Sequence, residues 1–219
     1  MKAIFFDLDN TLYDNKQYFL GAFKEVSKDL SKKFDVSQQK VYKNLIKLWR
    51  EKTSTHTYLF NDLLKKLNIK NGKTVKNVVK IFNGYRGKLE PYWDVIPTLK
   101  KLKKQGYKLG IITDGNVKRQ KRKLELLGIK NFFKTIIYTK EIVSKPSEKS
   151  FLVAIRRLNV NPEDTFYVAD NPLIDFKGAK KVGINTIRIR KGEFKNFPTN
   201  KFIDFEIKKI NELLKIIIK

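Results

Sequence analysis

The chain has 219 residues, of which 41% are hydrophobic, so it can bury one core and a small accessory unit but not two large domains. It contains no cysteine, which excludes disulfides and leaves oxygen ligands or the single histidine, His56, for any metal ion. The formal net charge of +26 indicates an anionic partner, but lysine and arginine are spread along the whole chain, which favours a general compositional bias.

The first predicted element is a strand. Residues 2–8 form a short apolar run that ends in acidic residues, as in a buried central strand of a parallel sheet. A strand that begins at Lys2 leaves no room for a signal peptide, and no apolar run reaches the roughly 18 residues that span a bilayer. We therefore expect a cytoplasmic protein without a membrane partner.

The next segment, residues 15–90, is predicted to be an all-helical insert. Its apolar residues recur at spacings of three and four, which is typical of helices packed on one face. Ser37 is expected to cap the second helix at its N-terminus. The predicted helices cover residues 18–34, 40–52, 57–69 and 74–86.

After Pro91, helices and strands alternate. Helices are expected near 95–105, 117–127, 147–158, 172–182 and 207–217, and strands at 107–113, 135–139, 165–169 and 185–189. This rhythm predicts an α/β fold with a doubly wound, Rossmann-like parallel sheet. The core would comprise residues 1–14 and 91–219, with residues 15–90 inserted as a helical cap. Ligands of such sheets bind beyond the carboxyl ends of the strands.

Polar residues follow several of these strands. Asp7 and Asp9 follow the first strand, which alone is a weak signal because turns commonly place Asp at strand ends. Thr113 ends a later strand and opens a turn into a helix, where donors converge on an anion. Asp170 and Asp175 follow another strand, and so many carboxylates would repel one another unless a cation lies between them.

A lysine stands at a further junction between a loop and a helix. Lys145 precedes Pro146, and the proline is suited to the first turn of the helix that follows. In a chain with so many lysines this residue alone carries little weight. Lys145 becomes a candidate site residue only because of its position in the chain relative to the other segments.

Together these segments resemble the four motifs of the haloacid dehalogenase superfamily, in its phosphatase form with a helical type 1 cap. The matching residues are Asp7, Asp9 and Thr11 for the first motif, Thr113 for the second, Lys145 for the third, and Asp170 and Asp175 for the fourth. The resemblance extends from residue 2 to about residue 190. The fourth motif commonly begins with Gly-Asp, whereas this chain has Ala169 before the aspartate.

The resemblance implies a magnesium-dependent phosphatase, a phosphoric monoester hydrolase with a phosphoaspartate intermediate. Asp7 would be the nucleophile, and Asp9 the acid and base, with a pKa raised toward neutrality. Magnesium would be held by Asp7, Asp9, through its backbone carbonyl, and Asp170. Asp175 would orient Lys145 or a bound water, with a direct ligand role as the alternative. The presence of Asp9 favours phosphoryl transfer over displacement of halide.

The resemblance also implies a phosphate-binding set. Its expected members are Thr113, the amides of Asp114 and Gly115, Asn116 and Lys145. The substrate would be a small phosphorylated metabolite such as a sugar, triose, glycolate or nucleotide monophosphate. A phosphosugar mutase with the same core is one alternative. A basic nucleic-acid-binding protein or nucleic-acid end phosphatase is another, and the oligomeric state is not predicted.

Other conspicuous residues receive simpler interpretations. His56 is expected in a capping or surface role, and the basic run 118–123 as a solvated helix face. The aromatic residues of the insert are expected to pack its helices together. They are Tyr18, Phe19, Phe23, Trp49, Tyr58 and Phe60. Tyr13, Asp14 and Asn15, which lead into the insert, are candidates for substrate specificity.

Overall fold

The computed structural model describes residues 2–52, 58–70 and 72–217, and the chain in it divides into two compact units. One unit comprises Met1–Asn15 and Leu89–Lys219, and the other Lys16–Lys88. Within the described residues, no helix is long and apolar enough to cross a membrane.

The first unit is built on a parallel sheet, which in the described part of the chain has six strands in the order β3-β2-β1-β4-β5-β6. The strands are β1 Ala3–Phe6, β2 Lys108–Thr113, β3 Thr135–Tyr138, β4 Thr165–Ala169, β5 Asn185–Ile189 and β6 Phe205–Ile207. β1 lies between β2 and β4 and is buried along its whole length, as its run of apolar residues predicts. The predicted doubly wound α/β sheet is confirmed.

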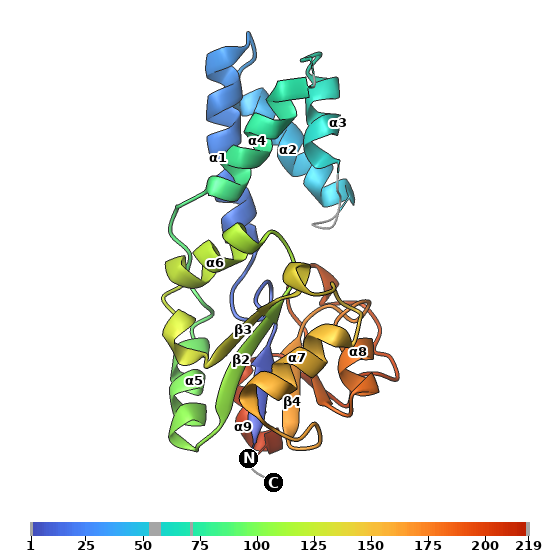
Figure 1. Ribbon diagram of the computed structural model, residues 1–219. Coiled ribbons are helices and arrows are strands. Elements are labelled where there is room, and N and C mark those ends of the chain that lie inside the picture. Colours follow the sequence, from blue (N-terminus) through green and yellow to red (C-terminus); the bar gives the residue numbers. More distant parts are fainter. Residues whose placement is uncertain (1, 53–57, 71, 218–219) are drawn as a thin grey trace. The chain divides into compact units, whose positions relative to one another are not determined.

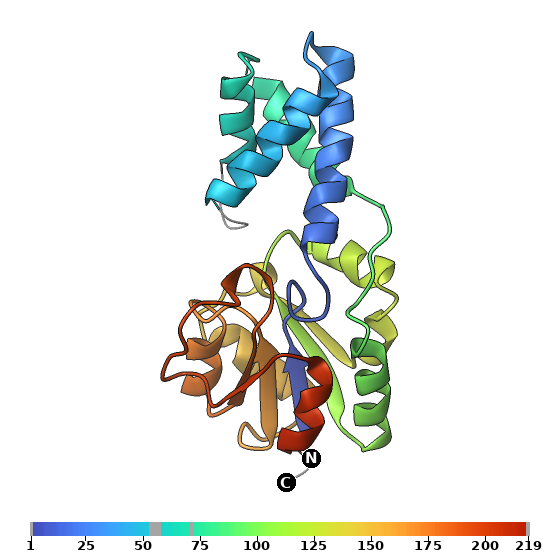
Figure 2. The same ribbon diagram turned by 180° about the vertical axis from the view of Figure 1, so that it is seen from behind.

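Helices cover both faces of this sheet. α7 and α8 lie on one face (Figure 1), and α5 and α9 lie on the other (Figure 2). The helices of this unit are α5 Val95–Lys104, α6 Val117–Leu126, α7 Lys149–Leu158, α8 Phe176–Lys181 and α9 Leu213–Ile217. Under α7 and α8, the ring of Tyr167 packs edge-on against Phe151, at 5.0 Å between ring centres, and also contacts Phe176.

The C-terminal part of this unit differs from the prediction. The helix expected over 207–217 is shorter, because Ile207 ends β6 and a 3-10 turn at Ile210–Glu212 precedes α9. The helix expected from residue 172 begins at Phe176. β6 was not predicted, since two of its residues are exposed at the edge of the sheet and show no buried alternation.

Among its described residues, the second unit contains helices and no strand. They are α1 Lys16–Lys33, α2 Gln38–Lys52, α3 Leu59–Lys66 and α4 Gly72–Gly84. α1 packs against α2 and α4, and α3 packs against the same two helices. The predicted cap of α2 is present, because the Ser37 hydroxyl accepts a hydrogen bond from the Lys40 amide at 3.2 Å.

Candidate functional site

The predicted site residues stand at the carboxyl ends of three adjacent strands. Asp7 follows β1, Thr113 ends β2 and Asp170 follows β4. The Asp7 amide donates a hydrogen bond of 2.8 Å to the Val168 carbonyl, which extends the β1–β4 ladder to the aspartate. Adjacent strands lie about 4.8 Å apart, so this arrangement gathers the three residues at one edge of the sheet.

Lys145 connects two of the buried carboxylates. Its ammonium lies 2.8 Å from Asp7 Oδ1 and 2.5 Å from Asp175 Oδ1, and it donates to the Tyr167 hydroxyl at 3.1 Å. Asp175 is held in turn, because its Oδ2 accepts the Asn171 amide at 2.9 Å. Asp175 therefore contacts Lys145 directly, which is the first of the two arrangements considered for it.

The electrostatics of Asp7 reflect this crowding. Burial raises the pKa of Asp7 to about 7, and the nearby Asp175 and Asp9 carboxylates add to the rise, while Lys145 opposes it. A nucleophilic carboxylate has to be ionised, so further positive charge at Asp7 would favour the reactive form. The surroundings of Asp7 are thus suited to a cation.

The loop that carries Lys145 packs closely against α8. A Cβ built on Gly178 would lie 2.6 Å from the Pro146 carbonyl oxygen and 2.8 Å from that of Ser147, so no larger residue fits without displacement. The Lys145–Pro146 peptide bond is cis, and α7 begins only at Lys149. The expectation that Pro146 lies in the first helical turn was wrong, since the loop continues beyond it.

Asp170 has the properties of a cation ligand. Its side chain is buried and its Oδ2 has no hydrogen-bond partner. Burial raises its pKa well above the usual value, and Asp175 and Asp7 add to the rise. Among the described residues no three acidic, histidine or cysteine side chains form a metal-binding group. The predicted set needs only two side chains, Asp7 and Asp170, with the Asp9 carbonyl, which fits magnesium because this ion keeps several water ligands.

The segment after β2 supplies the predicted phosphate-binding residues. Thr113 is buried and its hydroxyl accepts a hydrogen bond of 2.7 Å from Gln120 Nε2. Asp114 accepts hydrogen bonds from the Thr139 hydroxyl and from the Lys145 amide. Gly115 has φ +114°, a backbone conformation that L side chains rarely adopt.

Asn116 has a local structural role. Its Oδ1 accepts the Arg119 amide at 3.0 Å and caps α6 at its N-terminus. The residue is exposed, and its predicted contact with phosphate stays a prediction.

Asp9 lies in a network that sequence reasoning missed. Lys123 Nζ is 2.7 Å from Asp9 Oδ1 and 2.9 Å from Oδ2, while Gln120 Nε2 donates to Oδ2 at 3.0 Å and the Tyr13 hydroxyl to Oδ1 at 2.6 Å. Burial alone would raise the pKa of Asp9, but Lys123, Tyr13 and Gln120 outweigh it and lower the pKa. The expectation of a raised pKa is therefore wrong for this arrangement.

The basic run 118–123 is also not uniformly solvated. Gln120 and Lys123 are buried and point to Asp9. Burial lowers the pKa of Lys123 to about 8, although Asp9 opposes the shift. Their spacing of three residues places both on one face of the helix, but the sequence does not show what that face contacts.

Residues 13–15 were named as candidates for substrate specificity, and two of them, Tyr13 and Asn15, are buried beside Asp9. The Tyr13 hydroxyl lies 2.9 Å from Asn15 Oδ1, and Lys123 Nζ lies 3.3 Å from the same oxygen. Asp14 is partly exposed and remains a candidate for specificity. His56 lies outside the described residues.

The aromatic residues of the helical unit pack largely on one another. Phe19 stacks on Trp49 with 5.1 Å between ring centres, and Phe82 contacts Phe19, Phe23 and Phe60. Tyr58 differs from the expectation, since it is 64% exposed. Packing within the unit therefore explains most of this aromatic content.

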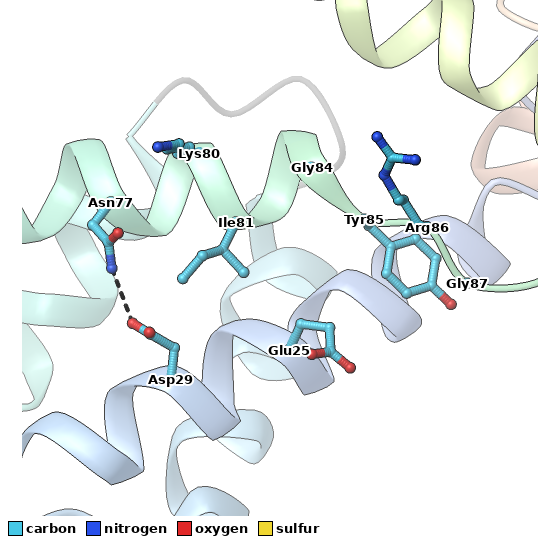
Figure 3. A pocket seen from close by; sticks show the side chains of 9 residues that line it. All are labelled: Glu25, Asp29, Asn77, Lys80, Ile81, Gly84, Tyr85, Arg86 and Gly87. Atoms are coloured by element: carbon cyan, nitrogen blue, oxygen red, sulfur yellow. Dashed lines mark hydrogen bonds between the residues drawn. The ribbon is translucent and has the colours of Figure 1, made fainter.

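A pocket of about 660 Å³ lies between α1 and α4 of the same unit (Figure 3). Its lining comprises Glu25, Asp29, Asn77, Lys80, Ile81, Gly84, Tyr85, Arg86 and Gly87. The Asp29 carboxylate already accepts hydrogen bonds from Asn77 at 3.0 Å and Lys33 at 2.6 Å. The pocket contains none of the predicted site residues, and its charged groups are largely exposed.

Comparisons with known proteins agree with these observations. A family model described as haloacid dehalogenase-like hydrolase matches residues 4–189. A glyceraldehyde 3-phosphate phosphatase of Methanopyrus kandleri is 36% identical, over 99% of this chain and 97% of its own length. The crystal structure of a phosphatase of that family from Thermococcus onnurineus is 29% identical, with a TM-score of 0.70 over 99% of this chain and 97% of that one.

A hydrolase from Bacillus subtilis, whose structure is described as bound to magnesium, has the same fold. Its TM-score is 0.75 over 99% of this chain and 98% of that one, at 20% identity. At this identity the likeness concerns the fold alone.

Proposed function

This chain belongs to the haloacid dehalogenase-like hydrolases, and we propose that it hydrolyses glyceraldehyde 3-phosphate or a similar three-carbon phosphate through a phosphoaspartate at Asp7. That it is a phosphatase acting on a small phosphorylated metabolite follows from its relatives. The observation that carries the proposal is the buried ammonium of Lys145 between Asp7 and Asp175 at the carboxyl end of the central strand.

The reaction has two displacements. In the first, an Asp7 carboxylate oxygen attacks phosphorus and the bond between phosphorus and the ester oxygen breaks. Asp9 gives the departing oxygen a proton, and for this step it has to be protonated, although its contacts with Lys123, Tyr13 and Gln120 favour the carboxylate. In the second, Asp9 takes a proton from a water molecule, whose oxygen attacks phosphorus and releases inorganic phosphate. Asp7 returns to the free carboxylate, and Asp9 is again the acid.

The phosphoryl group carries negative charge, which the chain has to offset. Lys145 contacts Asp7 at 2.8 Å and would also pair with a phosphoryl oxygen on that carboxylate. Thr113 and the amides of Asp114 and Gly115 would bind the remaining oxygens. These residues come from β2 and from the turn after it, adjacent to β1.

Magnesium would be held by Asp7, Asp170 and the Asp9 carbonyl. The unpartnered Asp170 Oδ2 and the raised pKa of both side chains support this assignment. Bound there, the ion supplies positive charge that keeps Asp7 ionised and attracts a phosphoryl oxygen. The proposed setting is cytoplasmic, where magnesium and phosphorylated metabolites are both present.

The proposal is tested with the purified protein and three phosphate esters of different size, namely glyceraldehyde 3-phosphate, phosphoglycolate and glucose 1-phosphate. Release of inorganic phosphate is measured with magnesium and with a chelator. We expect the triose phosphate to have the highest kcat/KM, and activity to be lost with chelator and in Asp7→Asn. Asp35→Asn, a change at an exposed aspartate, is the matched control.

Two outcomes would contradict the proposal. Conversion of glucose 1-phosphate to glucose 6-phosphate, faster than phosphate release, would indicate the mutase. Full activity of Asp7→Asn would exclude the phosphoaspartate mechanism.

A further inference from the structure

Lys123 is buried as deeply as Lys145, yet none of the four motifs includes it. Its side chain is 1% exposed and that of Lys145 is 3% exposed. A buried ammonium is costly unless a partner compensates it, and each of these lysines has a carboxylate at ion-pair distance. Lys145 pairs with Asp7, and Lys123 pairs with Asp9. Each of the two carboxylates of the mechanism thus has a lysine at ion-pair distance, and Lys145 is shared with Asp175.

The contacts of Lys123 constrain the direction of the Asp9 side chain. Its ammonium is within 2.9 Å of both carboxylate oxygens, so it lies across the end of the carboxylate. Gln120 adds a second link, because its Nε2 is shared between Asp9 Oδ2 at 3.0 Å and the Thr113 hydroxyl at 2.7 Å. Both residues project from α6, the helix that follows β2 in the chain (Figure 1).

The neighbours of Asp9 make such a constraint necessary. Asp7 and Asp170 are buried and close enough for the Asp9 charge to raise the pKa of both, and like charges in a buried site repel strongly. Without a cation of its own, the Asp9 side chain would turn away from these carboxylates or compete for the metal ion. Asp9 has to place one oxygen against the departing ester oxygen, and small displacements of a catalytic group are costly.

We propose that Lys123 is a positioning residue that, with Gln120, holds the Asp9 carboxyl group toward the leaving-group oxygen of the phosphate ester. In the assisted step the Asp9 O–H bond breaks and the proton bonds to the ester oxygen as that oxygen leaves phosphorus. At the same time the Asp7 oxygen bonds to phosphorus. Lys123 touches neither substrate nor metal in this step, and it acts only through Asp9. The inference rests on the proposed function.

The test compares two leaving groups, of which only one needs a proton in order to depart. Para-nitrophenolate is a stable anion that departs without a proton, whereas the alkoxide of a triose phosphate needs one. The ratio kcat/KM covers only the steps up to the phosphoaspartate, in which Asp9 acts as the acid. A defect in the placing of Asp9 should therefore reduce kcat/KM for the alkyl ester far more than for para-nitrophenyl phosphate.

The variants are Lys123→Met, which removes the ammonium, and Lys118→Met, a control at an exposed position of the same helix. We expect Lys123→Met to lower kcat/KM by about a hundredfold for the alkyl ester and by less than about threefold for the aryl ester, since general acids contribute about 10²–10⁴-fold. Because Lys123 acts through Asp9, the effects of the two substitutions on kcat/KM should not add. In an Asp9→Asn background, Lys123→Met should therefore change kcat/KM for the alkyl ester by less than about twofold.

Equal losses on the two esters, or a full additional loss in the Asp9→Asn background, would overturn the inference. Thermal melting of every variant separates unfolding from misplacement. If Lys123→Met does not fold, Lys123→Gln, which keeps a donor without the charge, is put through the same comparison with the same expected pattern. A wild-type protein that releases no phosphate would refute the proposed function, whereas an active wild type with uniform losses refutes only the role of Lys123.

Discussion

The Lys145 ammonium lies 2.8 Å from an Asp7 carboxylate oxygen, although 138 positions separate the two residues in the chain. The same ammonium is 2.5 Å from Asp175. One cation thus compensates two buried carboxylates, and its removal would leave both without this positive charge.

Replacement of Lys145 by methionine should reduce both activity and stability. Loss of one charged donor at the phosphoryl group should lower kcat by about 10²–10³. The two uncompensated carboxylates should lower the free energy of unfolding by about 3–5 kcal/mol. Steady-state kinetics and denaturant melts measure the two effects, with Lys149→Met at an exposed position as control. An unchanged kcat in the folded variant would exclude Lys145 from the site.

Gly178 on α8 should be needed for the position of Lys145. Because a Cβ would lie 2.6 Å from the Pro146 carbonyl oxygen, Gly178→Ala should displace the lysine loop and cost about 1–3 kcal/mol of stability. We expect kcat to fall with little change in KM. Lys177→Ala on the exposed side of the same helix should show neither effect. A Gly178→Ala protein with wild-type kcat would mean that the loop tolerates the added methyl group.

The raised pKa of Asp7 predicts how magnesium and pH act together on stability. Its pKa is 3.8 in an unperturbed side chain and about 7 here, mainly because of burial. Between these values the folded state binds more protons than the unfolded state, so this group lowers the free energy of unfolding as pH rises. Magnesium compensates the ionised carboxylate, and its stabilising effect should therefore be larger at about pH 8 than at about pH 5.

Melting temperatures with and without magnesium across that pH range test the effect. Asp7→Asn is the control, in which the gain from magnesium should become smaller and keep only the pH dependence that Asp170 contributes. The same gain at every pH in the wild type would show that Asp7 does not exchange its proton for the metal ion.

The net charge of +26 should have little influence on turnover. For a protein with many contacts to the phosphate backbone, raising salt from about 50 to about 200 mM lowers the affinity for nucleic acid by roughly a thousandfold or more. We expect kcat/KM for a small phosphate ester to fall by less than about tenfold over the same range. A gel-shift series with a nucleic acid at the same salt concentrations separates the two cases, and tight, steeply salt-dependent binding would support the nucleic-acid alternative.

The sequence was sufficient to predict the sheet and the strand ends because both follow from local signals. An apolar run that stops at a carboxylate marks β1, and the alternation after Pro91 marks the strands that flank it. Because these strands are parallel and adjacent, their carboxyl ends lie at the same end of the sheet. Asp7, Thr113 and Asp170 therefore lie together there. β6 was missed because Phe205 and Glu206 are exposed, so it has no buried face to detect.

The surroundings of Asp9 could not be predicted in the same way. Lys123 and Gln120 lie in a run of basic residues, where composition indicates a solvated surface. Only the tertiary packing of α6 turns these two side chains inward, and the sign of the pKa shift at Asp9 depends on that contact. Patterns of spacing along the sequence do not show which charged residues from distant segments come into contact.

The pairing of Tyr13 with Pro91 has a consequence for how the chain folds. These residues form an isolated antiparallel bridge, and the Tyr92 amide donates to the Leu12 carbonyl at 3.0 Å. The chain thus leaves the first unit just after Tyr13 and returns to it just before Pro91, and these two residues are paired with each other. The inserted helices pack on one another within Lys16–Lys88, whereas β1 pairs with strands that begin only at Lys108 and Thr165. During translation, the inserted unit can therefore acquire its structure while the first strand is still without neighbours.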